Sequence, residues 1–176
     1  MNNQSDRQSA ETRFREVFSH LRAVTAYARR RGSRDPDGIA AEAMTIAWRR
    51  LADVPVDDPL PWLYATARNL VLAEARLSAP PVHEGAAEHL DPPPLELDPS
   101  LDRALRSLSR LDREALLLVA WEDLTPKQAA RALRINPTAF RVRLLRARRR
   151  LRASLEREES AAPIASQLTH LDVEGT

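Results

Sequence analysis

The sequence predicts an all-α protein with two small helical domains, joined by a proline-rich acidic linker, and a helix-turn-helix in the C-terminal domain. The 176 residues include only four glycines, and no segment alternates apolar and polar residues as a half-buried strand does. Apolar residues instead recur at spacings of three and four, which is the pattern of a packed helix. Several of the 13 prolines follow a helix-capping residue, as in Asp35-Pro36, and such pairs mark helix starts.

Residues 12–78 form the first predicted domain. Its first helix places apolar side chains from Phe14 to Ala28 on one face. A second helix does the same from Ile39 to Leu51, and a third, starting at Pro59, from Leu60 to Val71. Three apolar stripes that face one another make a small helical bundle.

Residues 79–98 differ in character, with five prolines and five acids in this stretch. Such a composition cannot bury enough apolar surface to order itself, so we predict a flexible linker. Residues 99–155 form the second predicted domain, with four shorter helices. Residues 156–176 show no clear apolar period and are predicted to be a loose tail.

Several chemistries are not supported by the residue content. The chain has no cysteine, which excludes disulfides and thiolate zinc sites. Its four histidines lack metal-ligand spacing, and no nucleophile triad or phosphate loop is present. We therefore expect no enzyme, no catalytic residue, no metal and no cofactor. No apolar run approaches the roughly 18 residues of a membrane span, and the N-terminus lacks a signal peptide, so we expect a cytoplasmic protein.

Charge is distributed unevenly along the chain. Residues 99–155 carry a net charge of +9, whereas residues 79–98 carry −5 and residues 156–176 carry −4. A basic segment between acidic ones is typical of a nucleic-acid contact. The alternative is a solvated arginine-rich helix, and charge alone does not separate the two.

Residues 125–150 have the features of a helix-turn-helix. Thr125 precedes Pro126 and is followed three residues later by Gln128, which is the capping-box pattern. This helix is predicted to end near Arg134, and Asn136 with Pro137 starts the next helix after a short turn. Two helices joined by so short a turn cross steeply, which leaves the second free to enter a DNA major groove.

The second of these helices has a predicted DNA-reading face. If Phe140, Leu144 and Ala147 point inward, a rotation of about 100° per residue places Thr138, Val142 and Leu145 outward. Arginine binds guanine through two hydrogen bonds, and threonine or valine methyls contact the thymine methyl. The predicted DNA-binding residues are Asn136, Pro137, Thr138, Arg141, Val142, Arg143, Leu145, Arg146 and Arg149. The alternative is an amphipathic hairpin whose basic face is only solvated.

The chain resembles a known family in two places. The segment that begins LDRALRSLSRL and ends RARRRLRASL resembles the −35-binding domain of bacterial RNA polymerase sigma factors, most of all those of the extracytoplasmic-function (ECF) class. AEAMTIAWRRL followed by PWLYATARNLVLAEAR resembles the promoter-melting domain of the same class. The two segments occur in the family's order, and together they cover about residues 12–155.

The resemblance implies a function and partners. Members of the family are not enzymes; they bind core RNA polymerase, direct it to promoter DNA at the −35 and −10 elements, and help to melt the DNA. It also implies an anti-sigma factor as partner and a place in the cytoplasm on the nucleoid, without membrane insertion. The helix-turn-helix residues above become the −35 contacts.

The resemblance also implies roles for residues of the first domain. The polymerase-binding residues are Glu42, Met44, Trp48 and Arg49, although we expect the Trp48 ring to pack mainly in the core. The residues that contact or melt the −10 element are Asp53, Asp57, Asp58, Tyr64, Arg68, Asn69 and Arg76. Asp53, Asp57 and Asp58 lie in the loop where the family captures a flipped base. Tyr64 is expected either to be buried or to stack on a base.

The chain departs from the family pattern at Gly38, Ala41, Ala73 and Arg134. The family usually has glycine where Arg134 stands, so we expect a positive φ at that residue, at a cost of about 1 kcal/mol. Two other functions remain open from the sequence. One is a helix-turn-helix transcriptional activator; the other is a protein that binds polymerase or an anti-sigma factor without sequence-specific DNA contact.

Overall fold

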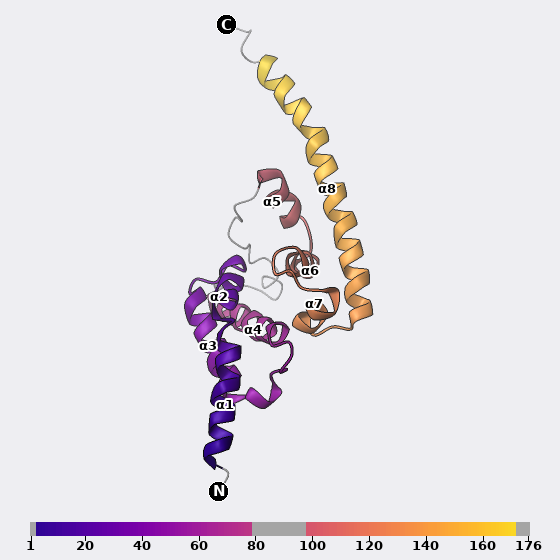
Figure 1. The fold of residues 1–176 in the computed structure, drawn as a ribbon. Helices are drawn as coiled ribbons and strands as arrows, with labels where there is room; N and C mark the ends of the chain where they lie inside the picture. Colours follow the sequence, from indigo (N-terminus) through magenta and orange to yellow (C-terminus); the bar gives the residue numbers. More distant parts are fainter. Residues whose placement is uncertain (1–2, 79–97, 172–176) are drawn as a thin grey trace. The chain divides into compact units, whose positions relative to one another are not determined.

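The protein is described by a computed structural model that covers residues 3–78 and 98–171, with side chains for residues 7–77, 98–158 and 160 (Figure 1). Over these ranges the chain is helical and contains no strand, as the sequence predicted. The predicted linker lies outside the described residues except for Asp98. The elements are α1 (Asn3–Phe18), α2 (Leu21–Arg30), α3 (Pro36–Arg49), η1 (Leu51–Asp53), α4 (Leu60–Ser78), α5 (Pro99–Arg106), α6 (Arg110–Ala120), α7 (Pro126–Leu133) and α8 (Pro137–Leu171).

The described helices fall into two compact units. The first contains α1 to α4 together with α7, and the second contains α5, α6 and α8. The sequence placed α7 with the C-terminal helices, whereas in the structure α7 packs against α4. The predicted boundaries between the two domains therefore stay a prediction.

The core of the first unit lies among α2, α3 and α4, which pack against one another (Figure 1). Tyr27 of α2 and Tyr64 of α4 stack with ring centroids 4.7 Å apart, and both rings are buried. Val24 and Leu63 are also fully buried, and both belong to the apolar faces that the sequence predicted for these helices. Spacing of three and four residues on each helix thus produces the core that the sequence predicted.

The first predicted helix is divided in two. The sequence pattern suggested one helix from Phe14 to Ala28, but α1 ends at Phe18 and α2 begins at Leu21. At the break the Ser19 hydroxyl donates to the Glu16 carbonyl (2.6 Å), and the His20 N–H bonds to Val17 instead of Glu16. A serine hydroxyl that competes for backbone carbonyls favours such an interruption, which the apolar period does not reveal.

The helices begin at the predicted pairs of capping residue and proline, except that α4 begins one residue later than predicted. The carboxylate of Asp35 accepts from the Gly38 N–H (2.9 Å), and that of Asp98 accepts from the Ser100 N–H (2.8 Å). Helix α4 starts at Leu60, one residue after the predicted Pro59. The Asp58 carboxylate is bonded to side chains of α7 instead, as described below.

The second unit is held together by an apolar core and by polar contacts from α5 and α6. Leu105, Leu118 and Phe140 are buried. The Arg113 side chain donates to the Leu105 carbonyl (3.0 Å), which ties α6 to the end of α5. Helix α8 runs on to Leu171, past residue 155, where the sequence placed the start of a tail; that boundary stays a prediction. Within the described residues no helix is both long and apolar enough to span a membrane.

Candidate nucleic-acid interface

The predicted helix-turn-helix has its local features in place. The Thr125 hydroxyl accepts from the Gln128 backbone N–H (3.3 Å), and the side-chain Oε1 of Gln128 accepts from the Thr125 backbone N–H (2.9 Å), which completes the capping box. Helix α7 ends at Leu133, and α8 begins at Pro137. Three residues therefore separate the two helices, as a helix-turn-helix requires.

Arg134 turns the chain between these helices. It adopts φ 54° and ψ 41°, the left-handed conformation expected for it from the sequence. The following N–H, that of Ile135, bonds to the Ala130 carbonyl (3.0 Å), which satisfies a carbonyl at the end of α7. A side chain in this conformation costs about 1 kcal/mol relative to glycine.

We expect Arg134→Gly to raise the free energy of unfolding by roughly 0.5–1 kcal/mol, because glycine adopts positive φ without strain. Urea denaturation followed by circular dichroism measures the change. The matched control is Arg152→Gly in the exposed interior of α8, which should lower stability by about 1 kcal/mol. If Arg134→Gly instead lowered the free energy of unfolding as much as Arg152→Gly does, Arg134 would not be strained.

The start of α8 presents an exposed face. Phe140, Leu144 and Ala147 are buried, as predicted. The predicted outward residues are all exposed; they are Asn136, Pro137, Thr138, Arg141, Val142, Leu145, Arg146 and Arg149. Val142 and Leu145 are 43% and 53% exposed and lie among the exposed arginines of this face. Apolar groups among arginines suit a groove that offers both thymine methyls and phosphates.

Arg143 lies differently from its neighbours. Its Nη1 donates to Oδ1 of Asp112 (2.9 Å). Arg150, two helical turns further along α8, bonds to Oδ2 of the same carboxylate. The Asp112 side chain is only 4% exposed. Arg143 is thus drawn toward α6, at the edge of the exposed face. No local pattern predicts this pairing, because Asp112 and Arg143 lie 31 residues apart in the chain.

The three predicted aspartates of the loop between α3 and α4 have different surroundings. Asp53 pairs with Arg50 (2.8 Å) on the surface. The two carboxylate oxygens of Asp58 accept from Gln128 Nε2 (3.2 Å each), and one also pairs with Arg131 of α7. Asp57 is exposed and lines a pocket between the loop and α1. Asp57 is thus the one of the three that lines this pocket.

Helix α4 carries the other predicted −10 residues. Tyr64 is 3% exposed and stacked on Tyr27, so of its two expected positions the structure shows the buried one. Arg68 is partly exposed, and Asn69 and Arg76 are exposed. Arg68 and Asn69 are adjacent in the sequence, and Arg76 lies seven residues, or about two helical turns, after Asn69. Asn69 and Arg76 therefore lie on nearly the same face of α4.

The predicted polymerase-binding residues divide into a buried and an exposed group. Met44 is 3% exposed and belongs to the core. Glu42 and Arg49 are exposed. Trp48 was expected to pack mainly in the core, but its side chain is 47% exposed, with one edge against Phe14 at 5.0 Å between centroids.

Hydrogen bonds from Ser100 hold the pKa of Asp98, the N-cap of α5, below its ordinary value. Among residues 3–78 and 98–171, no three acidic or histidine side chains are grouped as metal ligands.

Comparison with known proteins adds to this geometry. Residues 99–151 match the family described as sigma-70, region 4. The solved structure of CnrH in complex with the cytosolic domain of CnrY is similar over 81% of this chain and 87% of that chain, with a TM-score of 0.57 and 24% identity. The sigma factor RpoE in complex with the anti-sigma factor NepR from Bartonella quintana is similar over 81% and 95%, with a TM-score of 0.57 and 21% identity. No curated protein matches the chain in sequence.

Proposed function

We propose that the chain, whose residues 99–151 match the family described as sigma-70, region 4, is a sigma factor of the ECF class. It binds core RNA polymerase, recognises the −35 and −10 elements of a promoter and helps to melt the DNA. Polymerase supplies the catalysis, and the protein is not itself an enzyme. The fold likeness to solved sigma factors covers 81% of the chain, which supports this function over a helix-turn-helix activator with an unrelated sensor domain.

The exposed start of α8 carries the proposal for the −35 element. Thr138, Arg141 and Val142 lie in its first two turns, which is where a recognition helix meets base edges. Arg141 provides the paired donors that guanine accepts, and Val142 provides an apolar contact for a thymine methyl. Exposed Arg146 and Arg149, one and two turns further on, are placed for phosphates.

The first unit supplies the −10 contacts. Asp57 stands on the loop side, and Asn69 and Arg76 on the exposed face of α4. Arg76 would neutralise a phosphate of the melted strand, whereas the amide of Asn69 has both a donor and an acceptor for a base. Asp53 and Asp58 contribute less directly, since each is already paired with an arginine.

The surface of α3 is the proposed contact for polymerase. The exposed half of Trp48, flanked by Glu42 and Arg49, offers an apolar centre with charges at its edge, as protein interfaces do. Met44 supports this surface from the core. The same unit is the proposed target of an anti-sigma factor, and the protein is proposed to act in the cytoplasm on the nucleoid.

Reconstitution tests the proposed function directly. Purified protein added to core polymerase should start run-off transcription from fragments of its own genome that core enzyme alone does not transcribe. A protein heated beyond its unfolding transition serves as the inactive control. Absence of stimulation on every fragment, with a core enzyme that responds to another sigma factor, would refute the sigma function.

We expect Arg141→Ala to weaken discrimination among −35 sequences by roughly 1–3 kcal/mol, because the two hydrogen bonds to guanine are lost. Binding of the holoenzyme to −35 variants, measured by fluorescence anisotropy, gives the change. The matched control is Arg149→Ala, which should weaken binding to all sequences alike and lower the salt dependence by about one counterion. If Arg141→Ala behaves in the same uniform way, the reading surface lies elsewhere on α8.

A further inference from the structure

Three arginines of α8, spaced three and four residues apart, lie along one side of that helix. They are Arg143, Arg146 and Arg150, and we call them the arginine stripe. Arg146, in the middle, is exposed. The two outer members instead contact α6: Arg143 Nη1 donates to Oδ1 of Asp112 (2.9 Å), and Arg150 Nη1 donates to Oδ2 of the same carboxylate. A single acid of α6 therefore engages two of the three arginines.

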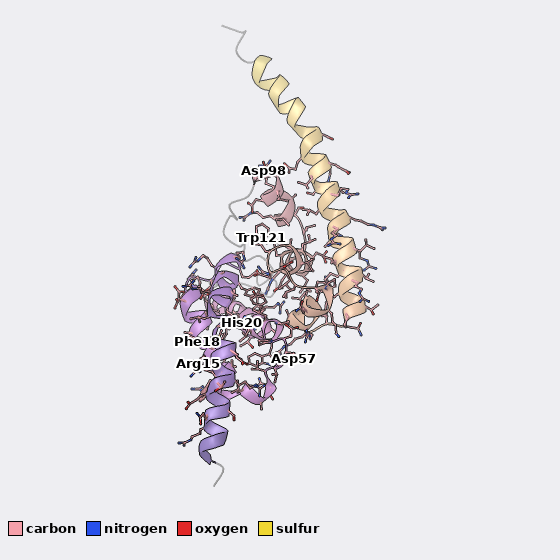
Figure 2. The ribbon with its side chains drawn as sticks, in the orientation of Figure 1. Arg15, Phe18, His20, Asp57, Asp98 and Trp121 are labelled. Carbon is pink, nitrogen blue, oxygen red and sulfur yellow. The ribbon has the colours of Figure 1, made fainter. Side chains whose placement is uncertain are left out.

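The Asp112 carboxylate is a fixed and buried partner. Its side chain is 4% exposed, whereas those of Arg143 and Arg150 are 35% and 61% exposed. The Asp112 backbone N–H donates to the hydroxyl of Ser109, the N-cap of α6 (3.3 Å); Trp121, labelled in Figure 2, marks the other end of this helix. The carboxylate thus lies in the first turn of α6, where the helix dipole favours a negative charge. Both arginines make charge-assisted hydrogen bonds to it.

The helix that carries Asp112 is itself anchored to its neighbours in the second unit. The Arg113 side chain donates to the Leu105 carbonyl near the end of α5 (3.0 Å). Helix α5 is in turn joined to α8 by a hydrogen bond between the hydroxyls of Ser107 and Ser154 (3.1 Å). The position of the Asp112 carboxylate beside α8 is therefore set by the packing of three helices.

The N-terminal part of α8 is strongly basic. Residues 137–155 contain seven arginines and no acid. Arginines that reach phosphates bind DNA of any sequence, so each of them adds affinity without adding specificity. Before Arg143 or Arg150 could bind a phosphate it would have to leave Asp112, whose carboxylate would stay desolvated without that partner. Asp112 therefore withdraws two of the seven arginines from sequence-independent binding.

We propose that Asp112 is a positioning residue that raises the specificity of α8 for the −35 element. It holds Arg143 and Arg150 away from phosphates, while Arg141 and Val142 stay exposed for base edges. The inference rests on the proposed sigma function and deepens its −35 recognition. Asp112 does not contact DNA; it acts through the two arginines and through the orientation that their bonds give to α8.

The salt dependence of DNA binding tests this role, because it counts phosphate contacts. Full-length protein, alone and with core polymerase, is bound to duplexes that carry the −35 element or a scrambled version of it, over a series of salt concentrations. Asp112→Asn releases the arginines, so the slope of log K against log salt should become steeper by about one to two. Affinity for the scrambled duplex should rise about threefold to tenfold, and preference for the −35 element should fall by about the same factor. Destabilisation alone would lower affinity without steepening the slope.

Further variants connect this effect to the arginines. In Asp112→Asn/Arg143→Gln/Arg150→Gln the released cations are absent, so the slope should return to within about half a counterion of wild type. Arg143→Gln alone should keep the wild-type slope. The matched control is Arg146→Gln, on the same stripe, which should make the slope shallower by about one. The comparison of Arg143→Gln with Arg146→Gln keeps the proposal testable if circular dichroism shows that Asp112→Asn does not fold.

Two outcomes would overturn the proposal. One is a folded Asp112→Asn protein with the slope and the −35 preference of wild type. The other is an Arg143→Gln slope as shallow as that of Arg146→Gln, which would show that Arg143 binds a phosphate despite Asp112. Failure of the sigma function itself is distinguishable, since wild type would then start no transcription in the reconstitution above, while the slopes on the scrambled duplex could still be compared.

Discussion

Phe140→Ala should lower the free energy of unfolding by about 3–5 kcal/mol and abolish recognition of the −35 element, although no DNA contact is altered. Phe140 is the only phenylalanine of the second unit and is 0% exposed. Removal of a buried aromatic ring loses its transfer free energy and leaves a cavity that the surroundings fill incompletely. Because domains have only about 5–15 kcal/mol of stability, this loss is a large fraction of the total.

Chemical denaturation followed by circular dichroism measures the stability, and anisotropy with −35 DNA measures the recognition. Phe140→Leu is the matched control, because it keeps most of the apolar volume. Its loss of stability should be less than about half of that caused by Phe140→Ala. Val142→Ala, two residues away and exposed, should change stability by less than about 0.5 kcal/mol. A Phe140→Ala protein that unfolds like wild type would show that α8 does not depend on this inward face.

Asp112→Ala should lower the free energy of unfolding by roughly 2–4 kcal/mol, the second large effect. Its carboxylate is 4% exposed and accepts from Arg143 (2.9 Å) and Arg150, two turns apart on α8. Loss of one member of a buried pair usually costs about 3–5 kcal/mol, because the remaining charge stays desolvated. The expected loss of stability is smaller here because the Arg150 side chain is 61% exposed and is hydrated again when its partner is gone.

Thermal or urea unfolding of single and double variants separates the pair from other effects. A double-mutant cycle of Asp112→Ala with Arg143→Ala should give a coupling of at least about 1 kcal/mol. The matched control is Glu158→Ala, whose partner Arg103 is 59% exposed and whose loss should cost no more than about 1 kcal/mol. Equal losses for the two acids would mean that Asp112 contributes only as a surface charge.

The elements that the sequence predicted well depend on neighbours within four residues. The caps at Asp35, Thr125 and Asp98 each join a side chain to a backbone N–H two or three residues later. The outward face at the start of α8 follows from helical geometry once its apolar positions are recognised. The left-handed Arg134 was instead predicted from the resemblance, because the family usually has glycine at that position.

The predictions that failed or stayed open depend on packing that local patterns do not carry. Trp48 belongs to an apolar stripe, yet its ring is half exposed. The stripe predicts the direction in which a side chain points, but it does not predict whether neighbouring helices cover that side chain. Tyr64 was compatible with two roles until its stack on Tyr27 showed the buried one. At the break near Ser19 the serine hydroxyl bonds to the Glu16 carbonyl, a contact that favours an interruption within an otherwise continuous apolar period.

By itself the sequence determined that the chain is helical, where most helices begin, and which face of residues 137–149 is exposed. It also placed a basic helix-turn-helix beside a segment that resembles a promoter-melting domain. Only the tertiary structure decided which charges are already engaged: Asp58 with Gln128 and Arg131, and Asp112 with Arg143. It also brought the end of α1 to the loop that carries Asp57. The physical reason is distance along the chain, because an ion pair or a pocket between residues 30 to 70 positions apart depends on how whole helices pack and leaves no periodic trace in the sequence.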